Sequence, residues 1–155
     1  MRPERAIGPT GEDAIRIRFS ADALSVRHTL QTMRRVLERR HAGQDFSMFE
    51  LVLAEVLNNV VEHAYAGCPE GIVRLFARSG GDEIEVTVTD SGKSFPAGVP
   101  PLRDFPVVDA DDPPEGGFGW PLIRALCTAL RYRREGERNI LDFTMRLEQV
   151  TAGSA

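Results

Sequence analysis

Several short stretches of the chain alternate apolar and polar residues. Between Ile15 and Phe19 every second residue is apolar and arginines lie between them, which predicts a strand with one buried face. Residues 72–76 and 84–88 are also predicted to be strands, and the Ser-Gly-Gly-Asp segment between them favours a hairpin turn. Two last strands are expected on either side of a turn at Glu135–Glu137.

Two other stretches repeat their apolar residues at the spacing of a helix. One lies between Ser20 and Gly43, and the other begins near Pro121, a residue type suited to the first turn of a helix. The apolar positions are Val26, Leu30, Met33 and Leu37 in the first and Leu122, Ile123, Leu126 and Leu130 in the second.

A helix between these two has the clearest start signal. Ser47 is followed three residues later by Glu50, which is the pattern of a capping box. The helix is expected to continue through Tyr65 and to end at Gly67, because glycine commonly follows the last helical turn.

A proline-rich tract interrupts the periodic pattern from Ser91 to Gly116. It contains six prolines and an acidic run formed by Asp109, Asp111 and Asp112. A long aperiodic segment inside a compact domain is typical of a functional lid. The predicted order is strand, two helices, two strands, lid, helix and two strands, which favours an α+β fold of two layers over a doubly wound parallel sheet.

The composition places limits on the kind of protein. The 155 residues include 19 Lys and Arg against 23 Asp and Glu, so the formal net charge is −4, which argues against binding nucleic acid through bulk charge. The length fits one domain, expected over residues 14–148, with flexible tails at 1–13 and 149–155. We expect a solvated basic strand edge formed by Arg131, Arg133 and Arg134.

The apolar segments and cysteines indicate the cellular compartment. No apolar run approaches the roughly 20 residues of a membrane-spanning helix, and Met1–Gly11 lacks the apolar stretch of a secretion signal. The two cysteines, Cys68 and Cys127, are too few for a disulfide framework, and both are expected to be buried thiols. We therefore expect a cytoplasmic protein.

Three polar residues recur every four positions along the second predicted helix. Glu55, Asn59 and His63 therefore lie on one stripe beside the apolar face. In a cleft, a carboxylate can orient or deprotonate a nucleophile, and an amide oxygen suits Mg²⁺. The alternative is a solvated helix edge with no chemical role.

Two segments that contain glycine add to this stripe. Asp90-Ser91-Gly92 follows a predicted strand. It is either a simple turn or a binding segment in which the Asp90 carboxylate accepts a hydrogen bond from an exocyclic amine and Gly92 lets the ring approach the backbone. Gly116-Gly117-Phe118-Gly119 precedes the last helix, where free backbone N–H groups can bind an anion, although a flexible hinge explains the same glycines.

Taken in this order, the three motifs resemble the N, G1 and G2 boxes of the GHKL ATPases, the group that includes gyrase, Hsp90, histidine kinases and MutL. The Asn-x-x-x-His-Ala ending of the first motif resembles one branch in particular, the bacterial anti-sigma factor serine-protein kinases of the RsbW and sporulation anti-sigma type. The resemblance extends roughly from Ile15 to Leu147. It is carried by Glu55, Asn59, His63, Ala64, Asp90, Gly92, Gly117 and Gly119.

This resemblance implies the Bergerat fold, a two-layer α/β sandwich in which a mixed, mostly antiparallel sheet has helices on one face and a long ATP lid spans 91–116. It also implies that ATP or ADP and Mg²⁺ bind. Glu55 would be the general base for an acceptor serine, Asn59 the magnesium ligand, and His63 would line the phosphate side.

The resemblance assigns the remaining nucleotide-binding positions as well. These would be Asp90 and Gly92 at the adenine, and Gly117, Phe118 and Gly119 at the phosphates. Many relatives carry a threonine in the last strand that supports the adenine-binding aspartate, and Asn139 falls near that place here.

The implied function is that of an anti-sigma factor with ATP-dependent serine-protein kinase activity. Such a protein phosphorylates an anti-anti-sigma antagonist of the STAS type and sequesters a sigma factor, and its relatives tend to be homodimers without direct contacts to nucleic acid or membrane. The residues before the glycines are acidic here, where relatives often have a basic residue. The alternative is therefore a catalytically weak or inactive nucleotide-binding module that regulates a partner by binding alone.

Overall fold

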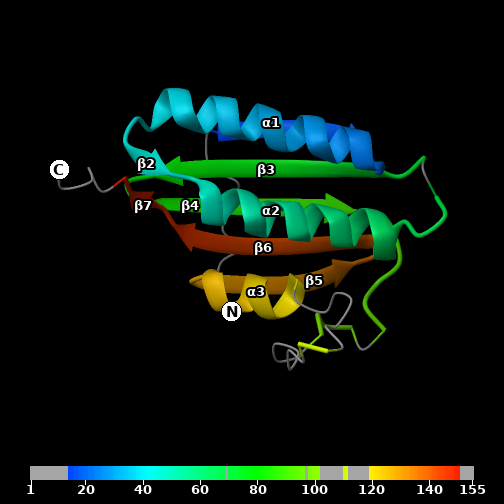
Figure 1. The fold of residues 1–155 in the computed structure, drawn as a ribbon. Coiled ribbons are helices and arrows are strands. Elements are labelled where there is room, and N and C mark those ends of the chain that lie inside the picture. The colour runs from blue at the N-terminus through cyan, green and yellow to red at the C-terminus, as the bar shows by residue number, and fades with distance from the viewer. Residues whose placement is uncertain (1–13, 69, 97, 102–109, 112–118, 151–155) are drawn as a thin grey trace, which may run out of the picture.

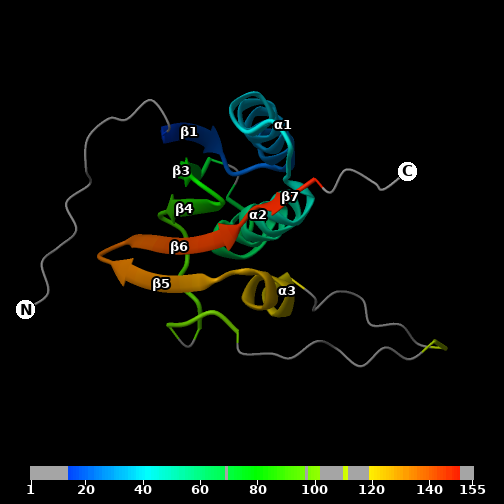
Figure 2. The same ribbon diagram turned by 90° about the vertical axis from the view of Figure 1, so that its left-hand side faces the viewer.

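The computed structural model describes residues 14–68, 70–96, 98–101, 110–111 and 119–150. These form two layers, a sheet and a set of helices that all lie on the same side of it (Figure 2). The helices are α1 (Ala23–Arg40), α2 (Ser47–Asn59), the π-helical turn η1 (Val60–Ala64) and α3 (Gly119–Leu126). The α+β sandwich expected from the sequence is confirmed.

The main sheet of the described residues has five strands in the order β1-β3-β4-β6-β5 (Figure 1). Its strands are β1 (Ala14–Ser20), β3 (Ile72–Gly80), β4 (Glu83–Asp90), β5 (Ala129–Glu135) and β6 (Arg138–Arg146). Every neighbouring pair in it is antiparallel, so the described sheet is antiparallel throughout where mostly antiparallel pairing was expected. The hairpin turns at Gly81 and Gly136 use left-handed backbone, with φ of +62° and +60°, which glycine adopts without steric cost.

Two strands of two residues each had no signal in the sequence pattern. β2 (Gln44–Asp45) pairs with β7 (Glu148–Gln149) outside the main sheet, and the Val150 N–H donates to the Gly43 carbonyl at 2.8 Å. β7 therefore includes Gln149, the first residue of the expected C-terminal tail.

The core lies between the sheet and the helices. Alternate residues of each central strand point towards the helices, as the two-residue period of a strand requires. The buried apolar residues of the two central strands β3 and β4 and of helix α2 are Val73, Leu75, Ala77, Ile84, Val86, Val88, Phe49, Val52, Leu53, Val56 and Leu57. Burial of these side chains holds the helix layer against the sheet.

The start of α2 differs from the predicted capping box. Ser47 is the first helical residue, and the Asp45 side chain, two residues earlier, accepts a hydrogen bond from the Ser47 N–H at 2.8 Å. Glu50 instead forms an ion pair with Arg34 of α1 at 3.3 Å. The capping prediction was wrong because Asp45 reaches the helix start and the packing of α1 supplies Glu50 with a cation.

The end of this helix also differs from the prediction. Regular α-helix stops at Asn59, and the Tyr65 N–H donates to the Val60 carbonyl at 3.0 Å, the five-residue step of a π-helical turn. Tertiary contacts hold Tyr65 in place, because its hydroxyl donates to the Ile72 carbonyl at 2.9 Å and accepts from the Ser91 N–H at 2.7 Å.

The two cysteines occupy different environments. Cys68 is exposed in the turn between η1 and β3, so the expectation that it is buried was wrong. Cys127 is partly buried, and burial raises the pKa of its thiol to about 11. The helices of the described residues also include none with the length and apolar character needed to cross a membrane.

Candidate functional site

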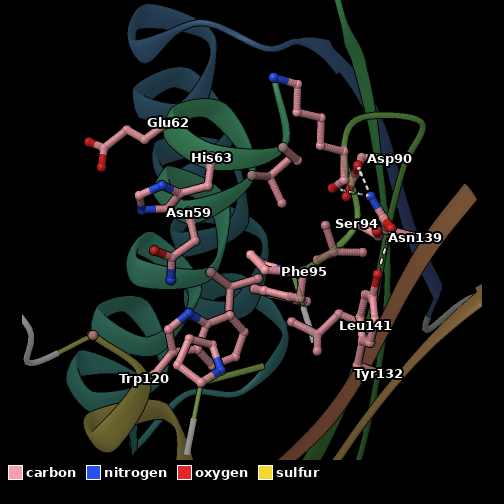
Figure 3. A pocket seen from close by; sticks show the side chains of 18 of the residues that line it. Asn59, Glu62, His63, Asp90, Ser94, Phe95, Trp120, Tyr132, Asn139 and Leu141 are labelled. Carbon is pink, nitrogen blue, oxygen red and sulfur yellow. Dashed lines mark hydrogen bonds between the residues drawn. The ribbon is translucent and has the colours of Figure 1, made fainter. Parts of the chain in front are cut away.

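A cavity of about 590 Å³ lies between the helix layer and the sheet, where α2 passes into η1 (Figure 3). The end of β4, the start of α3 and the β5–β6 hairpin close its other sides. Its lining includes five residues that the sequence singled out, Asn59, His63, Asp90, Gly119 and Asn139. The fold therefore brings together motifs that are far apart in the chain.

Asn59 and His63 of the helical stripe line one wall of this cavity, and Glu55 lies one helical turn before Asn59. Glu55 and Asn59 are half-buried and His63 is exposed. Within the described residues, Nδ2 of Asn59 is buried and has no hydrogen-bond partner. An unsatisfied buried polar atom costs about 1–3 kcal/mol, so this amide is suited to a polar group that enters the cavity.

Gly119 brings the start of α3 against the same stripe. A Cβ atom at this position would lie 2.7 Å from Oε2 of Glu55 and 3.8 Å from Nδ2 of Asn59. A larger residue there would require the Glu55 carboxylate to move, and the first N–H groups of a helix are free to bind an anion. Gly117 and Phe118, the other two residues assigned to the phosphates, lie outside the described residues.

Asp90 forms the opposite wall at the end of β4. Its residue is 5% exposed, and its Oδ1 accepts from the Gly92 N–H at 2.9 Å and from Nδ2 of Asn139 at 2.7 Å. Burial raises the pKa of the Asp90 carboxyl, against the lowering effect of these two hydrogen bonds and of the Arg134 charge. In the described part of the chain Oδ2 accepts no hydrogen bond, so it is available to a ligand.

Gly92 holds the chain after Asp90 close to η1. A Cβ atom on Gly92 would lie 2.3 Å from the Ala64 carbonyl oxygen, and that oxygen accepts from the Lys93 N–H at 2.8 Å. The glycine is needed for this approach of two backbones, which places Asp90 beside the helical stripe.

Asn139 lies on β6 directly opposite Asp90 in the sheet. It is 5% exposed, and its Oδ1 accepts from the Tyr132 hydroxyl at 2.6 Å and from Nη1 of Arg134 at 2.7 Å. The sequence pattern did not place Tyr132 or Arg134 at the site. The sequence signal that could have found them is the two-residue period of β5, which turns both side chains towards the helix side of the sheet.

The expected solvated edge of β5 is therefore only partly correct. Arg131 is exposed, whereas Arg133 forms ion pairs with Asp142 and Glu135 on the other face of the sheet. Arg134 contacts the cavity network through Asn139.

Aromatic residues fill the side of the cavity next to α3. Phe95 packs edge-on against Trp120 and Tyr132, with ring centroids 5.2 Å and 4.8 Å apart. The sequence pattern had given Trp120 no role at the site. The described residues between 91 and 116 contain neither helix nor strand, and most of the expected lid lies outside the described residues.

The donor set of the cavity does not form a metal site by itself. The described residues contain no cluster of three or more His, Cys, Asp or Glu side chains that could hold a metal ion. Mg²⁺ nevertheless needs few protein ligands, since it keeps several waters and takes other oxygens from substrate phosphates. A single amide such as Asn59, turned so that its oxygen faces the cavity, fits that requirement.

Known proteins of related sequence are kinases or contain a kinase-like ATPase domain. A family model described as a histidine kinase-like ATPase domain matches residues 19–145. The chain is similar to the blue-light-activated histidine kinase 2 of Erythrobacter litoralis, with 27% identity over 144 residues, or 90% of this chain and 34% of that protein. It is also similar to the serine/threonine-protein kinase BtrW of Bordetella bronchiseptica, with 32% identity over 93 residues, or 58% of this chain and 63% of BtrW.

A solved structure has the same fold. The structure of the RsbU and RsbW domains of Rv1364c from Mycobacterium tuberculosis matches 90% of this chain and 33% of that one, with 22% identity and a TM-score of 0.58. The chain thus spans about a third of the length of this protein and of the blue-light-activated kinase.

Proposed function

The chain belongs to the histidine kinase-like ATPase domain family, and from this premise we propose that it is an ATP-dependent serine-protein kinase that acts as an anti-sigma factor. It phosphorylates an anti-anti-sigma antagonist of the STAS type and, in its other state, sequesters a sigma factor. The observation that carries the proposal is the unpartnered Asn59 amide beside Glu55 and Gly119, in a cavity that Asp90 closes.

In this proposal the base of ATP or ADP binds at Asp90. Its free Oδ2 accepts a hydrogen bond from the exocyclic amine of adenine, and Asn139 and Gly92 hold Oδ1 from the other side. The close approach of Gly92 to Ala64 keeps this carboxylate beside η1. An exocyclic carbonyl, as in guanine, would face the ionised Asp90 carboxylate, which has no proton to donate to it.

The phosphates bind at the other end of the cavity. The backbone of Gly119, continuous with Gly117 and Phe118, donates to phosphate oxygens at the N-terminus of α3. Among the described residues that line the cavity, His63 and Lys93 are the side chains that can carry positive charge. Asn59 supplies an oxygen to Mg²⁺, which when bound neutralises charge on the phosphates.

Glu55 is the proposed catalytic residue. Its carboxylate lies beside Gly119, so a serine hydroxyl presented there can transfer its proton to Glu55 as its oxygen bonds to the terminal phosphorus. The bond between that phosphorus and ADP breaks in the same step.

The proposed assembly follows from the same assignment. Residues 14–148 act as one nucleotide-binding domain, two copies form a homodimer, and the protein works in the cytoplasm, where sigma factors bind RNA polymerase. A second candidate is a nucleotide-binding module without kinase activity. The acidic residues Asp109, Asp111 and Asp112, which repel a polyphosphate if they face it, favour this candidate.

The test is transfer of labelled terminal phosphate from ATP to a purified STAS-type antagonist. We expect transfer by the wild type, loss of about a hundredfold or more in Glu55→Gln with ATP binding kept, and unchanged transfer in the matched control Glu83→Gln, an exposed carboxylate at the far end of β4. ATP binding without transfer in the wild type would favour the binding module. Equal transfer by Glu55→Gln would remove Glu55 from the catalytic role.

A further inference from the structure

The side of the main sheet that points away from the helices carries a group of arginines. All described helices lie on the other side, and no described helix or strand covers this one (Figure 2). Strands β1 and β3 contain no acidic residue and direct four exposed arginines to the open side. We call the group formed by Arg16, Arg18, Arg74, Arg78 and Phe76 the arginine face. Positive charge is concentrated there, although the whole chain has a formal net charge of −4.

The strand register places two of these arginines directly opposite each other. Arg18 of β1 pairs with Arg74 of β3, and the β4 neighbour of Arg74 is the uncharged Thr89. Neither arginine forms an ion pair with a described residue. Like charges directly opposite in a sheet are destabilising. The fold therefore keeps two exposed guanidinium groups side by side without a counter-charge.

Phe76 lies at the centre of the arginine face. It is opposite Arg16 in the register, and the Arg16 guanidinium lies over its ring, 5.0 Å from the centroid. Arg74 and Arg78 are two positions away along β3, and Arg78 forms an ion pair with Glu85 of β4 at 3.3 Å. Arginine and aromatic residues are the types enriched where proteins bind one another.

Protection of the sheet edge explains only part of this pattern. Basic residues on an edge strand such as β1 hinder its pairing with other chains. Arg74 lies on β3, an inner strand between β1 and β4, where no edge needs protection. Its position opposite Arg18 costs stability, and such a cost on an open surface is expected where function requires it.

A second copy of the chain is a poor occupant of this surface. The remaining strands of the same side mix Glu83 and Glu85 of β4 with Arg131 and Arg133 of β5 and Arg138 of β6. They offer no excess of negative charge to the arginine face of another copy. The proposed homodimer is therefore expected to use a different surface.

A nucleic acid also fits this surface poorly. Phe76 is the aromatic residue that the described strands direct to this side, and the Arg16 guanidinium lies over its ring. No ring is therefore free for the stacking of bases. The negative net charge of the chain also opposes the approach of a phosphate backbone.

We propose that the arginine face is a docking surface for an acidic segment of a partner protein, whose carboxylates pair with Arg18 and Arg74 and whose chain lies across Phe76. A carboxylate matches the planar donor geometry of a guanidinium. One carboxylate between Arg18 and Arg74 adds an attraction to each of them, which offsets their mutual repulsion. The surface lies on the side of the sheet opposite the helices, so the inference goes beyond the proposed kinase function and does not depend on it.

The test compares Arg18→Gln/Arg74→Gln with the matched control Arg35→Gln/Arg39→Gln, which removes two exposed arginines of α1. The probe is a synthetic peptide in which glutamate and valine alternate, so that an extended chain presents its carboxylates on one side. Its affinity is measured by fluorescence anisotropy, with a peptide of alternating glutamine and valine as the reference.

The wild type and the control are expected to bind the glutamate peptide and to bind the glutamine peptide about tenfold more weakly. In Arg18→Gln/Arg74→Gln the affinity for the glutamate peptide should fall about tenfold, since two exposed charge pairs are lost. Binding to the wild type should weaken as the salt concentration rises.

A second measurement needs no partner. Arg74→Gln removes the repulsion with Arg18, so we expect a higher midpoint of denaturant unfolding than in the wild type. Arg78→Gln loses the ion pair with Glu85 and should not raise the midpoint. A lower midpoint for Arg74→Gln would show that the two arginines stabilise the fold, and the premise of the inference would be wrong.

Three outcomes of the binding test overturn the inference. Equal affinity of the wild type and Arg18→Gln/Arg74→Gln for the glutamate peptide would place its binding elsewhere. A change in the sedimentation of that variant would make a second copy the occupant. Tighter binding of a single-stranded DNA oligonucleotide of the same charge would make a nucleic acid the occupant.

ATP binding, measured on the same samples, separates this inference from the proposed function. We expect Arg18→Gln/Arg74→Gln to bind ATP as the wild type does, because both residues lie on the side of the sheet away from the helices. Failure of the peptide to bind therefore leaves the proposed kinase function standing, and failure of phosphate transfer leaves the docking surface standing.

Discussion

At the scale of single residues, the site carries features that cost stability and serve a ligand. Asp90 is buried with hydrogen bonds to only one of its oxygens, and Asn59 keeps a buried nitrogen without a partner in the described structure. Both conditions are unfavourable in the absence of a ligand. Residues of this kind are expected where stability and binding compete.

The first prediction concerns Asp90→Asn in the absence of nucleotide. Asparagine keeps an oxygen for Gly92 and Asn139 and removes the buried charge, so we expect the variant to be more stable at pH 7 by about 1 kcal/mol and to bind ATP more weakly. Thermal unfolding and calorimetry on the same samples measure the two effects.

The pH dependence of this difference has a definite sign. Burial raises the pKa of Asp90 above its ordinary value of 3.8, so the folded wild type holds this proton more tightly than the unfolded chain does. The stability contributed by the bound proton is complete below pH 3.8 and is lost as the pH rises through the folded pKa. The advantage of Asp90→Asn should therefore shrink on acidification. A variant less stable than the wild type at pH 7 would show that hydrogen bonds to Asp90 outweigh its burial.

At the scale of elements, the π-helical turn η1 and the segment after β4 hold each other in position. The turn from Val60 to Ala64 ends with a carbonyl that accepts from the Lys93 N–H. The Tyr65 hydroxyl forms hydrogen bonds with Ile72 at the start of β3 and with Ser91, the residue after β4. Single π-helical turns inside helices occur frequently at functional sites. Here the turn joins the wall that carries Asn59 to the wall that carries Asp90.

The second prediction tests this junction with Gly92→Ala. The added Cβ would lie 2.3 Å from the backbone oxygen of Ala64, so one backbone must move, and overpacking of this kind costs about 1–3 kcal/mol. We expect a lower midpoint of denaturant unfolding and weaker ATP binding.

The matched control is Gly80→Ala at the end of β3. An added Cβ there has no described atom within 4 Å, and the Gly80 backbone is not left-handed. We expect its stability to remain within about 0.5 kcal/mol of the wild type. Equal effects of the two substitutions would mean that the contact between Gly92 and Ala64 is not tight in solution.

At the scale of the whole molecule, the cavity lies where the two layers meet. Its walls come from α2, η1 and α3 of the helix layer and from β4, β5 and β6 of the sheet. A ligand that fills it contacts both layers and favours the folded state over the unfolded chain. Binding should therefore be visible in global stability.

The third prediction is a rise in thermal stability with nucleotide. At a free ATP concentration of 100 times Kd with Mg²⁺, linkage gives about 2.7 kcal/mol, which corresponds to roughly 5–10 °C in Tm for a domain of this size. Removing Mg²⁺ with a chelator should reduce the shift in the wild type. In Asn59→Ala the shift should be smaller and insensitive to the chelator. An equal response of Asn59→Ala to Mg²⁺ would exclude Asn59 as the magnesium ligand.

The sequence by itself determined the elements and the composition of the helical wall. The two-residue period of Ile15–Phe19 and the helical period of Val26–Leu37 depend only on which side of a local element is apolar, and both predicted elements are confirmed. The spacing of Glu55 and Asn59 placed them on one stripe for the same reason, since neighbouring turns of an α-helix fix that geometry locally, whereas His63 lies beyond them in the π-helical turn.

Only the tertiary structure decided which of these residues meet. Asp90 bonds to Asn139, 49 positions later, because β4 pairs with β6, and Gly119 contacts Glu55 because α3 packs against α2. The end of α2 depends on the hydrogen bonds of Tyr65 with Ile72 and Ser91. The contact of Arg134 with Asn139 depends on the pairing of β5 with β6. Sheet order and register arise from long-range packing, which leaves no periodic signal in the chain, so the contacts of Tyr132 and Arg134 with Asn139 became visible only in the folded protein.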